Sequence, residues 1–293
     1  MSGAFTLPDS WRAVRLVLTR PSGWPHASAV AEVIESLVHG FRALGVAADT
    51  GENEVCAGAI NIFFMAHVMG TGDAAQLPPN SIIYNFEQVG GAINLLTPAF
   101  RMAISCHRVW DYSSRNMEQL APLIGHDRRQ VLPVGYVPAL TRIPRARVQD
   151  IDVLFYGAVN ERRRDILMEI QRAGLRVHSL FGVYGAERDA LIARAKVVLN
   201  IHAHPTKVLE VVRISYLLAN RKAVVTELDA DTELDPDIVD AVAGASYEHL
   251  VAECRRLVAD AAERQDLEDR GYNIVQRRDL VPMLRCAITE AAA

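Results

Sequence analysis

Residues 197–227 read VVLNIHAHPTKVLEVVRISYLLANRKAVVTE. A short apolar run leads into a polar loop with two histidines, then into an amphipathic stretch, and finally into a second apolar run. This order is typical of a buried strand, a helix and a neighbouring parallel strand. Open α/β sheets bind ligands beyond the carboxyl ends of their strands, so the loop is a candidate ligand site, with a solvated loop as the alternative. The side chains that suggest the site belong to His202, His204, Lys207, Glu210 and Arg213.

The same alternation of apolar runs and amphipathic stretches extends along the whole chain. It predicts strands at residues 13–18, 46–49, 60–64, 81–86, 108–112 and 130–133, and again at residues 152–156, 176–180, 197–201 and 223–226. It predicts helices at residues 27–44, 160–173, 187–195 and 208–220, and a helical tail from residue 247. Alternating strands and helices indicate parallel sheets that are covered on both faces.

The stretch PALTRIPRARVQD, residues 138–150, breaks this periodicity with two prolines and several charges, as a linker does. We therefore predict an α/β fold of two Rossmann-like domains with a cleft between them. The first domain is expected to span residues 1–140 and the second residues 150–293. Clefts between domains are common ligand sites.

Composition excludes several classes of protein. The 293 residues suffice for two domains, and half of them are hydrophobic. The net charge of -4 gives no reason to expect nucleic-acid binding. No uncharged apolar run approaches the roughly 20 residues of a membrane span, and the N-terminus does not resemble a signal peptide. The four cysteines are scattered singly, which fits a reducing compartment, so we predict a cytoplasmic protein of undetermined oligomeric state.

The second half opens with DVLFYGAVNERRRDIL, residues 152–167. Gly157 follows the predicted strand, and Asn160 is a suitable N-cap for the helix behind it. Arg162 and Arg163 in the first turn oppose the helix dipole, unless an anion such as a pyrophosphate binds there. An exposed basic turn is the alternative interpretation. The full GxGxxG fingerprint of nicotinamide binding is absent from the sequence.

Glu210 is expected at the start of the helix that follows the histidine-rich loop. A carboxylate there can accept hydrogen bonds from both hydroxyls of a ribose, although a first-turn glutamate also matches the helix dipole without any ligand. His202 and His204 lack a third ligand at metal spacing, so no metal site is predicted. Asp229 and Asp231 are interpreted as part of a solvated acidic loop.

Polar and aromatic residues follow several predicted strands of the first half. Trp24 and His26 lie in a Gly/Pro loop, and Asn85, Glu87 and Gln88 precede a double glycine. Around residues 110–116 the candidates for contact with a hydroxyl-rich ligand are Trp110, Asp111, Tyr112 and Asn116. Each could instead be an N-cap or a buried aromatic with a satisfied polar tip.

The segment DVLFYGAVNERR with LFGVYGAERDALIARAKVVLNIHAHPTKVLEVVRISYLLANRKAVVTE resembles the donor domain of GT-B-fold glycosyltransferases, closest to the bacterial spore-maturation type. The resemblance covers residues 152–227, and the first half only by element order and PVGYVP at residues 133–138. It implies that the donor diphosphate binds at Gly157, Asn160, Arg162 and Arg163. It also implies that Glu210 binds the ribose, beside His202 and Lys207, and that no bound metal is needed. Many retaining members have a second glutamate where this chain has His202, so the stereochemical course stays open.

The resemblance implies a glycosyltransferase that moves a sugar from a nucleotide-diphosphate donor, its co-substrate, to an unknown acceptor, with no other cofactor. The donor is expected on the second half and the acceptor on the first, near Trp110, Tyr112 and Asn116. An inverting enzyme needs a general base, and the candidates are Glu87, Asp111 and His26, in that order. The alternatives are a catalytically silent nucleotide-binding or partner subunit and a nucleotide-sugar epimerase.

Overall fold

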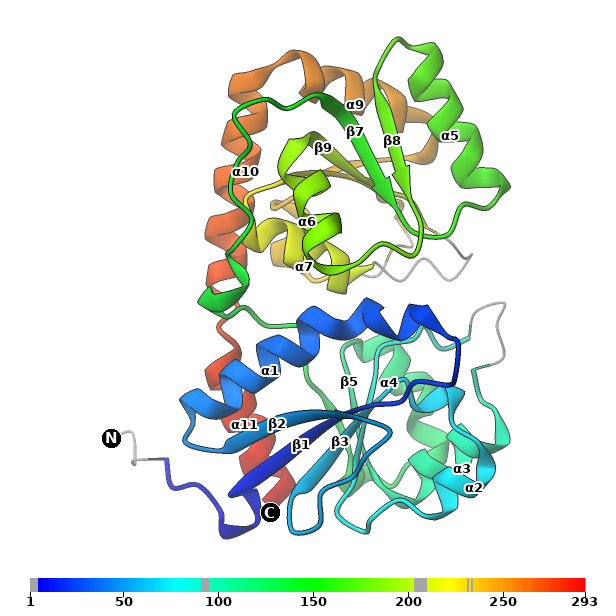
Figure 1. The fold of residues 1–293 in the computed structure, drawn as a ribbon, viewed down its shortest axis with the longest axis vertical. Coiled ribbons are helices and arrows are strands. Elements are labelled where there is room, and N and C mark those ends of the chain that lie inside the picture. The colour runs from blue at the N-terminus through cyan, green and yellow to red at the C-terminus, as the bar shows by residue number, and fades with distance from the viewer. Residues whose placement is uncertain (1–4, 91–94, 203–209, 231, 233, 293) are drawn as a thin grey trace. The chain divides into compact units, whose positions relative to one another are not determined.

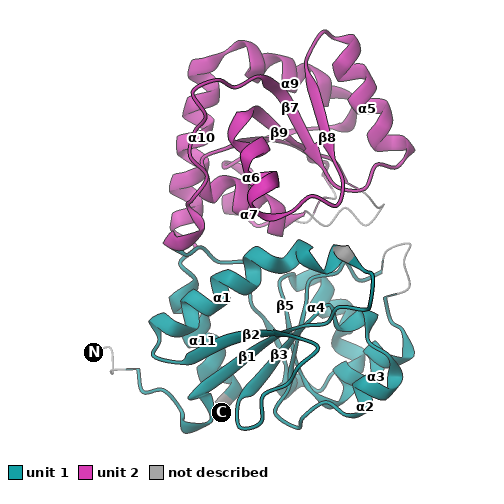
Figure 2. Cartoon of the chain, in the orientation of Figure 1, with its two compact units in different colours: residues 1–137, 279–293 teal, residues 138–278 magenta. Residues whose placement is uncertain are grey.

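The structure is a computed structural model that describes residues 5–90, 95–202, 210–230, 232 and 234–292 (Figure 1). The chain divides into two compact units (Figure 2). Unit 1 comprises Met1–Val137 together with Asp279–Ala293, and unit 2 comprises Pro138–Arg278. Each unit contains its own parallel sheet, which confirms the predicted α/β fold with two Rossmann-like sheets.

The sheet of unit 1 has six strands in the order β2-β1-β3-β4-β5-β6, and every neighbouring pair is parallel. All six lie within or beside the predicted ranges: β1 (Ala13–Leu18), β2 (Ala47–Glu52), β3 (Ile60–Phe64), β4 (Ile82–Asn85), β5 (Arg108–Asp111) and β6 (Arg129–Val131). Strand β3, with the sequence INIFF, is buried along its whole length because it lies inside a sheet that is covered on both faces. The carboxyl ends of β1, β3 and β4 are therefore neighbours at one edge of the sheet.

Helices cover this sheet. They are α1 (Ala31–Ala43), α2 (Thr71–Ala75), α3 (Pro98–Cys106), α4 (Ser114–Leu120) and α11 (Leu280–Ala292). One core cluster joins Val17, Phe63, Ile83 and Val109 of the strands to Phe100, Ala103 and Ile104 of α3. The first predicted helix begins later than expected, because Pro25–Val30 form a 3-10 helix and α1 begins at Ala31.

The last helix, α11, belongs to unit 1, which corrects the expectation that residues 150–293 form one domain. It packs on α1 at Gly40, where an added Cβ would lie 2.6 Å from Leu284 Cδ1. The Leu280 amide donates to the Tyr136 carbonyl (3.0 Å), and Arg108 donates to the Ala291 carbonyl (3.2 Å). Close packing and hydrogen bonds to three other parts of unit 1 thus fix this helix.

The sheet of unit 2 has five parallel strands in the order β11-β10-β9-β7-β8. They are β7 (Ile151–Tyr156), β8 (Val177–Leu180), β9 (Ala195–Asn200), β10 (Ala223–Glu227) and the short β11 (Ala243–Ala245), which the sequence pattern did not predict. The helices are α5 (Glu161–Arg172), α6 (Gly185–Arg194), α7 (Val211–Ala219), α8 (Pro236–Val239), α9 (Leu250–Ala259) and α10 (Ala261–Gln276).

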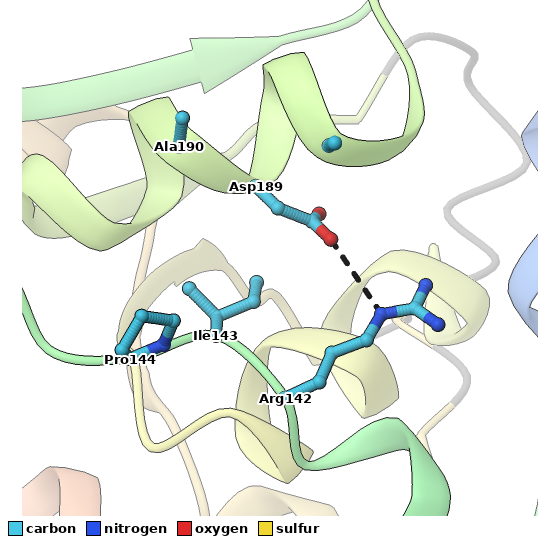
Figure 3. Close-up of a pocket in the computed structure, with 6 residues that line it drawn as sticks. Arg142, Ile143, Pro144, Asp189 and Ala190 are labelled. Carbon is cyan, nitrogen blue, oxygen red and sulfur yellow. Dashed lines mark ion pairs between the residues drawn. The ribbon is translucent and has the colours of Figure 1, made fainter.

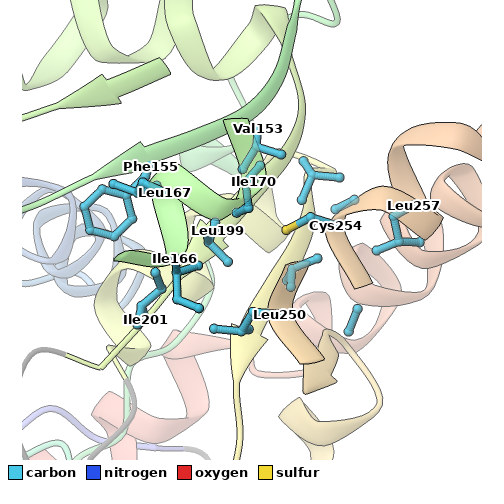
Figure 4. Packing of buried hydrophobic residues seen from close by; sticks show 14 of the residues in the cluster. Val153, Phe155, Ile166, Leu167, Ile170, Leu199, Ile201, Leu250, Cys254 and Leu257 are labelled. Carbon is cyan, nitrogen blue, oxygen red and sulfur yellow. The ribbon is translucent and has the colours of Figure 1, made fainter. Parts of the chain in front are cut away.

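The core of unit 2 lies between β7, β9 and β10 on one side and α5 and α9 on the other (Figure 4). Ile166 and Ile170 of α5 and Leu250, Cys254 and Leu257 of α9 are all buried in it. Helix α9 lies in the tail from residue 247 that the sequence pattern predicts to be helical. Among the described residues, no helix combines the length and apolar character that a membrane span requires.

Candidate functional site

Three segments meet at the carboxyl edge of the sheet in unit 2. Strands β7, β9 and β10 are neighbours, so the turn after Tyr156, the segment Ile201–His202 and the end of β10 at Glu227 lie side by side. Helix α7 begins directly behind this edge, with Glu210 as its N-cap residue. The structure thus brings together the described residues that the sequence analysis selected for donor binding.

The turn after β7 is shaped by Gly157 and Asn160. Gly157 has φ +138, a conformation that favours glycine, and its amide donates to the Leu180 carbonyl at 3.0 Å. Asn160 Oδ1 accepts from the Arg163 amide at 3.0 Å, which confirms the predicted N-cap. Helix α5 therefore starts at the sheet edge, with the partial positive charge of its N-terminus directed there.

Arg162 forms an ion pair with a buried carboxylate. Its guanidinium makes two contacts with Glu227, one of them 2.6 Å between Nη1 and Oε2. Glu227 is fully buried and also accepts from the His202 amide at 3.1 Å. The Arg162 guanidinium lies 3.9 Å from the centre of the Tyr247 ring. Glu227 thus offsets the charge of Arg162 and connects α5 to the ends of β9 and β10.

Arg163 is buried and holds the edge together. It donates to the Ile201 carbonyl through Nε (3.0 Å) and Nη2 (2.5 Å), and to the Ala158 carbonyl at 2.8 Å. Its Nη2 also lies 3.2 Å from Glu210 Oε1. Burial lowers the pKa of Arg163 to about 10, so the side chain stays charged at neutral pH.

Glu210 is the central anion of the site. Its Oε2 accepts from Asn200 Nδ2 at 2.9 Å and lies 3.4 Å from Nδ1 of the buried His202. The imidazole contact lacks good hydrogen-bond geometry, so we treat it as electrostatic. Burial raises the pKa of Glu210, but the contacts with His202 and Asn200 and the longer-range charge of Arg213 outweigh it and lower the pKa to about 2. Glu210 is therefore a carboxylate throughout the neutral range.

Arg213 in the first turn of α7 differs from the two arginines of α5. Its Nη1 donates to Asn200 Oδ1 at 2.6 Å, and its guanidinium lies 5.0 Å from the centre of the Tyr156 ring. Its buried Nε has no hydrogen-bond partner among the described residues, and no described carboxylate lies within ion-pair distance. A Cβ on Gly157 would lie 3.0 Å from Nη2 of Arg213. Arg213 thus presents a cation beside the glycine turn.

Two of the selected histidine-loop residues cannot be placed. His204 and Lys207 lie outside the residues that the structure describes. Asp231 does so as well, whereas Asp229 is described and its amide donates to Thr232 Oγ1 at 3.0 Å. Within the described ranges, no group of three or more histidine, cysteine or acidic side chains is arranged to hold a metal ion.

In unit 1, Asp111 organises the loop after β4. The fully buried carboxylate accepts from Asn85 Nδ2 (2.7 Å), the Ser113 amide (2.8 Å) and Asn116 Nδ2 (3.1 Å). Asn116, also fully buried, donates to the Glu87 carbonyl and accepts from the Val89 amide, both at 2.9 Å. This network fixes residues 85–89. The structure therefore corrects the expectations that Asp111 is an accessible base and that Asn116 contacts an acceptor.

Trp110 is likewise a core residue. It is fully buried and stacks on Trp11 with ring centres 6.0 Å apart. It cannot stack on an acceptor, which corrects the prediction for this residue. Tyr112 is half-buried and stacks on Phe86, with centres 5.6 Å apart and planes 1° apart.

The half-buried polar groups of unit 1 gather at the ends of β1, β3 and β4. Glu87 follows β4, and its Oε1 lies 3.9 Å from Nε2 of His67, which follows β3. Trp24, after β1, packs edge-to-face with both His67 and His26, each with ring centres 6.1 Å apart. Burial lowers the pKa of His67 to about 4 and raises the pKa of Glu87. His67 is not among the site residues predicted from the sequence, although a histidine soon after the apolar run of β3 was a usable signal.

A separate open pocket of about 360 Å³ lies in unit 2 between residues 142–144 and helix α6 (Figure 3). An ion pair links the two segments, with Arg142 Nε 3.6 Å from Asp189 Oδ2. The Tyr216 hydroxyl also donates to this oxygen, at 2.7 Å. The Arg142 and Ile143 amides both donate to Asn220 Oδ1 at 2.8 Å. The predicted linker is therefore fastened to unit 2. None of the residues selected for binding or catalysis is among those that line this pocket.

Comparison with known proteins identifies the fold. No family model matches the chain. Over 106 residues the chain is 34% identical to the uncharacterized protein L138 of Acanthamoeba polyphaga mimivirus, a segment that is 35% of this chain and 12% of that protein. The matched segment is thus a small part of that relative.

Solved structures match far more of the chain. Anabaena Alr3699/HepE, solved in complex with UDP and glucose, matches with a TM-score of 0.62 and 13% identity over 96% of this chain and 99% of that one. For sucrose-phosphate synthase from Thermosynechococcus elongatus the TM-score is 0.58 and the identity 11%, over 96% of this chain and 98% of that one. TarM matches with a TM-score of 0.54 and 11% identity, and this chain covers 55% of its length. The chain therefore has the GT-B fold, and its structural neighbours are glycosyltransferases.

Proposed function

We propose that the protein is a glycosyltransferase that moves a sugar from a nucleotide-diphosphate donor to an acceptor hydroxyl. The donor binds at the carboxyl edge of the sheet in unit 2, and the acceptor binds on unit 1. The fold supports this proposal, and HepE, with the same fold, was solved with UDP and glucose bound. At these low identities the fold alone does not assign an activity, so the proposal depends on the chemistry of the edge.

The observation that carries the proposal is the guanidinium of Arg213 beside the Gly157 turn. Its Nε has no described partner, and the N-terminus of α5 opens at the same turn. At this turn, the unused N–H of a cation and the free amides of a helix N-terminus can donate hydrogen bonds to the same anion. They can bind an anion that has several oxygens. A diphosphate has this character. The charges of Arg162 and Arg163 are already offset by Glu227 and Glu210, so they support the site from behind.

During transfer, the acceptor oxygen forms a bond to the anomeric carbon while the bond from that carbon to the diphosphate oxygen breaks. The electron pair leaves with the diphosphate. Arg213 and the amides of the first turn of α5 stabilise the negative charge that develops there. Arg163 holds Glu210 in place, and Glu210 accepts hydrogen bonds from the ribose hydroxyls. Lys207 and His202 remain proposed donor contacts.

Calorimetric titration tests the donor site. UDP, GDP, ADP and TDP are titrated into the wild-type protein with and without EDTA, and the tightest ligand is then titrated into two variants. Arg213→Gln removes the cation that carries the proposal and should weaken binding by roughly 1.5–3 kcal/mol, or about 10- to 150-fold. Arg164→Gln is the matched control, because Arg164 belongs to α5 and its side chain is exposed. It should change the affinity by less than about threefold.

The outcomes separate the alternatives. Loss of binding in EDTA, equal effects of the two variants, or no nucleotide binding below the millimolar range would contradict the donor site. A protein that binds a nucleotide sugar but neither transfers nor hydrolyses it is a silent subunit. One that converts the bound sugar to its epimer is an epimerase. Product analysis by chromatography distinguishes the three.

A further inference from the structure

The half-buried groups on unit 1 form a second cluster, which we define as Trp24, His67 and Glu87. They come from segments far apart in the sequence, and each follows one of three neighbouring strands, β1, β3 and β4. His67 and Glu87 face each other, and Trp24 packs against the His67 ring. The side-chain surfaces of His67 and Glu87 are 13% and 37% exposed, so both groups are reachable. The cluster combines an aromatic ring, an imidazole and a carboxylate.

The His67–Glu87 distance suits a shared ligand oxygen. At 3.9 Å, Nε2 and Oε1 are too far apart for a direct hydrogen bond. A hydroxyl oxygen to one side of the line between them can lie about 2.8 Å from each. In the tautomer that carries the proton on Nε2, His67 donates to that oxygen while the hydroxyl donates to Glu87. The pair can thus orient one hydroxyl group through both its lone pair and its proton.

Backbone strain accompanies the placement of His67. Met65, two residues earlier, has φ 59, in the left-handed region that side chains other than glycine rarely adopt. Such a conformation is strained and persists where the surroundings enforce it, often at functional sites. It turns the chain directly from β3 into the short 3-10 helix Ala66–Val68 that carries His67.

The charge of the cluster indicates which acceptor it can bind. Burial keeps the imidazole of His67 neutral at pH 7, because its pKa is lowered to about 4. Arg20, at the end of β1, forms an ion pair with Glu52 at 3.1 Å and donates to Ser28 Oγ at 3.2 Å, so its charge is offset. Glu87 therefore remains as the net charge of the cluster, which disfavours an anionic ligand. The ring of Trp24 is an apolar surface that can pack on the C–H groups of a sugar.

We propose that Trp24, His67 and Glu87 form the acceptor subsite, and that the acceptor is a neutral saccharide whose reacting hydroxyl lies between His67 and Glu87. This inference rests on the proposed function, because an acceptor presupposes transfer. As the hydroxyl oxygen bonds to the anomeric carbon and the diphosphate departs with its electron pair, the hydroxyl proton moves to Glu87. The proton then passes from Glu87 to water. His67 holds the oxygen through Nε2–H and does not change its own protonation.

Intrinsic fluorescence gives a readout that does not depend on activity. The chain has three tryptophans, and Trp11 and Trp110 are buried at 2% and 0% exposure, whereas Trp24 is half-buried. The methyl glycosides of glucose, galactose and mannose are titrated into wild-type protein with UDP present. At least one should give a saturable change in emission. Glucuronate and glucose 6-phosphate, as the anionic counterparts, should bind at least tenfold more weakly.

Variants assign the signal to the subsite. Trp24→Phe should abolish the emission change. His67→Gln should weaken glycoside binding roughly 2- to 12-fold, as expected for one lost hydrogen bond. His39→Gln on α1, an exposed histidine of the same unit, is the matched control and should leave binding unchanged. Thermal unfolding of each variant verifies that it is folded.

Several results would overturn the inference. They are no saturable response to any neutral glycoside up to about 100 mM, an equal response in Trp24→Phe, or tighter binding of the anionic sugars. Calorimetry with UDP on the same samples keeps the two proposals apart. If UDP binds but no glycoside does, only the acceptor subsite fails. If glycosides bind but no nucleotide does, only the donor site fails.

Discussion

The two units have parallel sheets of similar design, but the edges of these sheets differ in chemistry. The edge of unit 2 carries paired charges, with Arg162 on Glu227 and Arg163 on Glu210, and one further cation at Arg213. The corresponding edge of unit 1 carries amides around a buried Asp111 and a half-buried cluster of Trp24, His67 and Glu87. The same backbone architecture thus carries a cationic edge in one unit, where we propose that an anion binds, and a polar edge in the other, where we propose that a neutral ligand binds.

The largest expected effect concerns the unit 1 edge. Glu87→Gln keeps the shape of the side chain and removes the base, so turnover should fall by roughly 10²–10⁴-fold while UDP affinity stays within a few-fold. Steady-state kinetics with a saturating donor measures the change. Glu118→Gln, an exposed glutamate of α4, is the control and should behave as wild type. Wild-type turnover in Glu87→Gln would place the base elsewhere or indicate a mechanism without one.

The second prediction tests whether Asp111 serves structure or chemistry. Asp111→Ala removes an acceptor from three buried donors, of which the side-chain amides of Asn85 and Asn116 keep the Glu87 carbonyl, so the free energy of unfolding should fall by about 3 kcal/mol. Urea denaturation measures the change. Asp127→Ala, at an exposed position, should stay within about 0.5 kcal/mol of wild type. A stable Asp111→Ala protein that lacks turnover would reverse our assignment and make Asp111 a catalytic group.

The third prediction uses pH to examine the charged edge of unit 2. The pKa of Glu210 is lowered from 4.5 to about 2, so the folded state favours its carboxylate. Its stabilising effect is complete above pH 4.5 and is lost as the pH falls toward 2. Glu210→Gln should therefore be less stable than wild type by a few kcal/mol at most at pH 7, and the gap should shrink below pH 4.5.

Urea midpoints at pH 7, 4 and 3 test this dependence. The sequence alone suggested a glutamate at the helix start that binds a ribose or matches the helix dipole, and the contacts with Arg163, Asn200 and His202 give it a structural role as well. UDP binding to Glu210→Gln should also weaken by roughly 1.5–3 kcal/mol. A gap that does not vary with pH would show that these contacts do not depend on the charge of Glu210.

The smallest effect is expected at Gly157. Gly157→Ala forces a side chain into φ +138 and brings its Cβ to 3.0 Å from Arg213 Nη2, so it should cost about 1–2 kcal/mol of stability and weaken UDP binding. Gly174→Ala is a matched control. Gly174 also has a positive φ, of +86, but a Cβ added there would meet no described atom within 4 Å. Gly174→Ala should therefore lose stability without losing UDP affinity. Equal UDP affinities of Gly157→Ala and Gly174→Ala would argue against Arg213 as a ligand group.

Most of the fold was predictable because apolar periodicity reports burial directly. Of the eleven strands in the described part of the chain, the pattern located ten, and the central ones follow runs such as INIFF and VLFY, where a buried parallel strand is apolar throughout. The missed strand β11 has three residues, Ala-Gly-Ala, which carry too little side chain to produce a pattern. The return of α11 to unit 1 was also unpredictable, because an amphipathic helix shows that it has an apolar face but not which surface covers it.

The site was predictable in position but less so in roles. The sequence pattern placed residues at strand ends near the edge of the sheet. It could not give their hydrogen-bond and ion-pair partners, because these partners come from distant segments of the chain. Arg162 meets Glu227 across 65 positions, and Asn85 meets Asp111 across 26. Trp110 lies inside β5 and is fully buried, whereas Tyr112 follows the end of the strand and is half-buried. The exact end of the strand, which a sequence pattern does not fix, separates the core residue from the edge residue.

The assignment of α11 to unit 1 has a consequence for the order in which the protein matures during synthesis. Unit 2 is a continuous segment inserted between two parts of unit 1, so the ribosome completes it before it makes residues 279–293. Domains generally fold as units while the chain emerges. Unit 2 can therefore reach its native state while α1 still exposes the surface around Gly40 that Leu280 and Leu284 later cover. The N-terminal unit is thus the last to be completed, and a released chain truncated after residue 278 should contain a folded unit 2 and an unfinished unit 1.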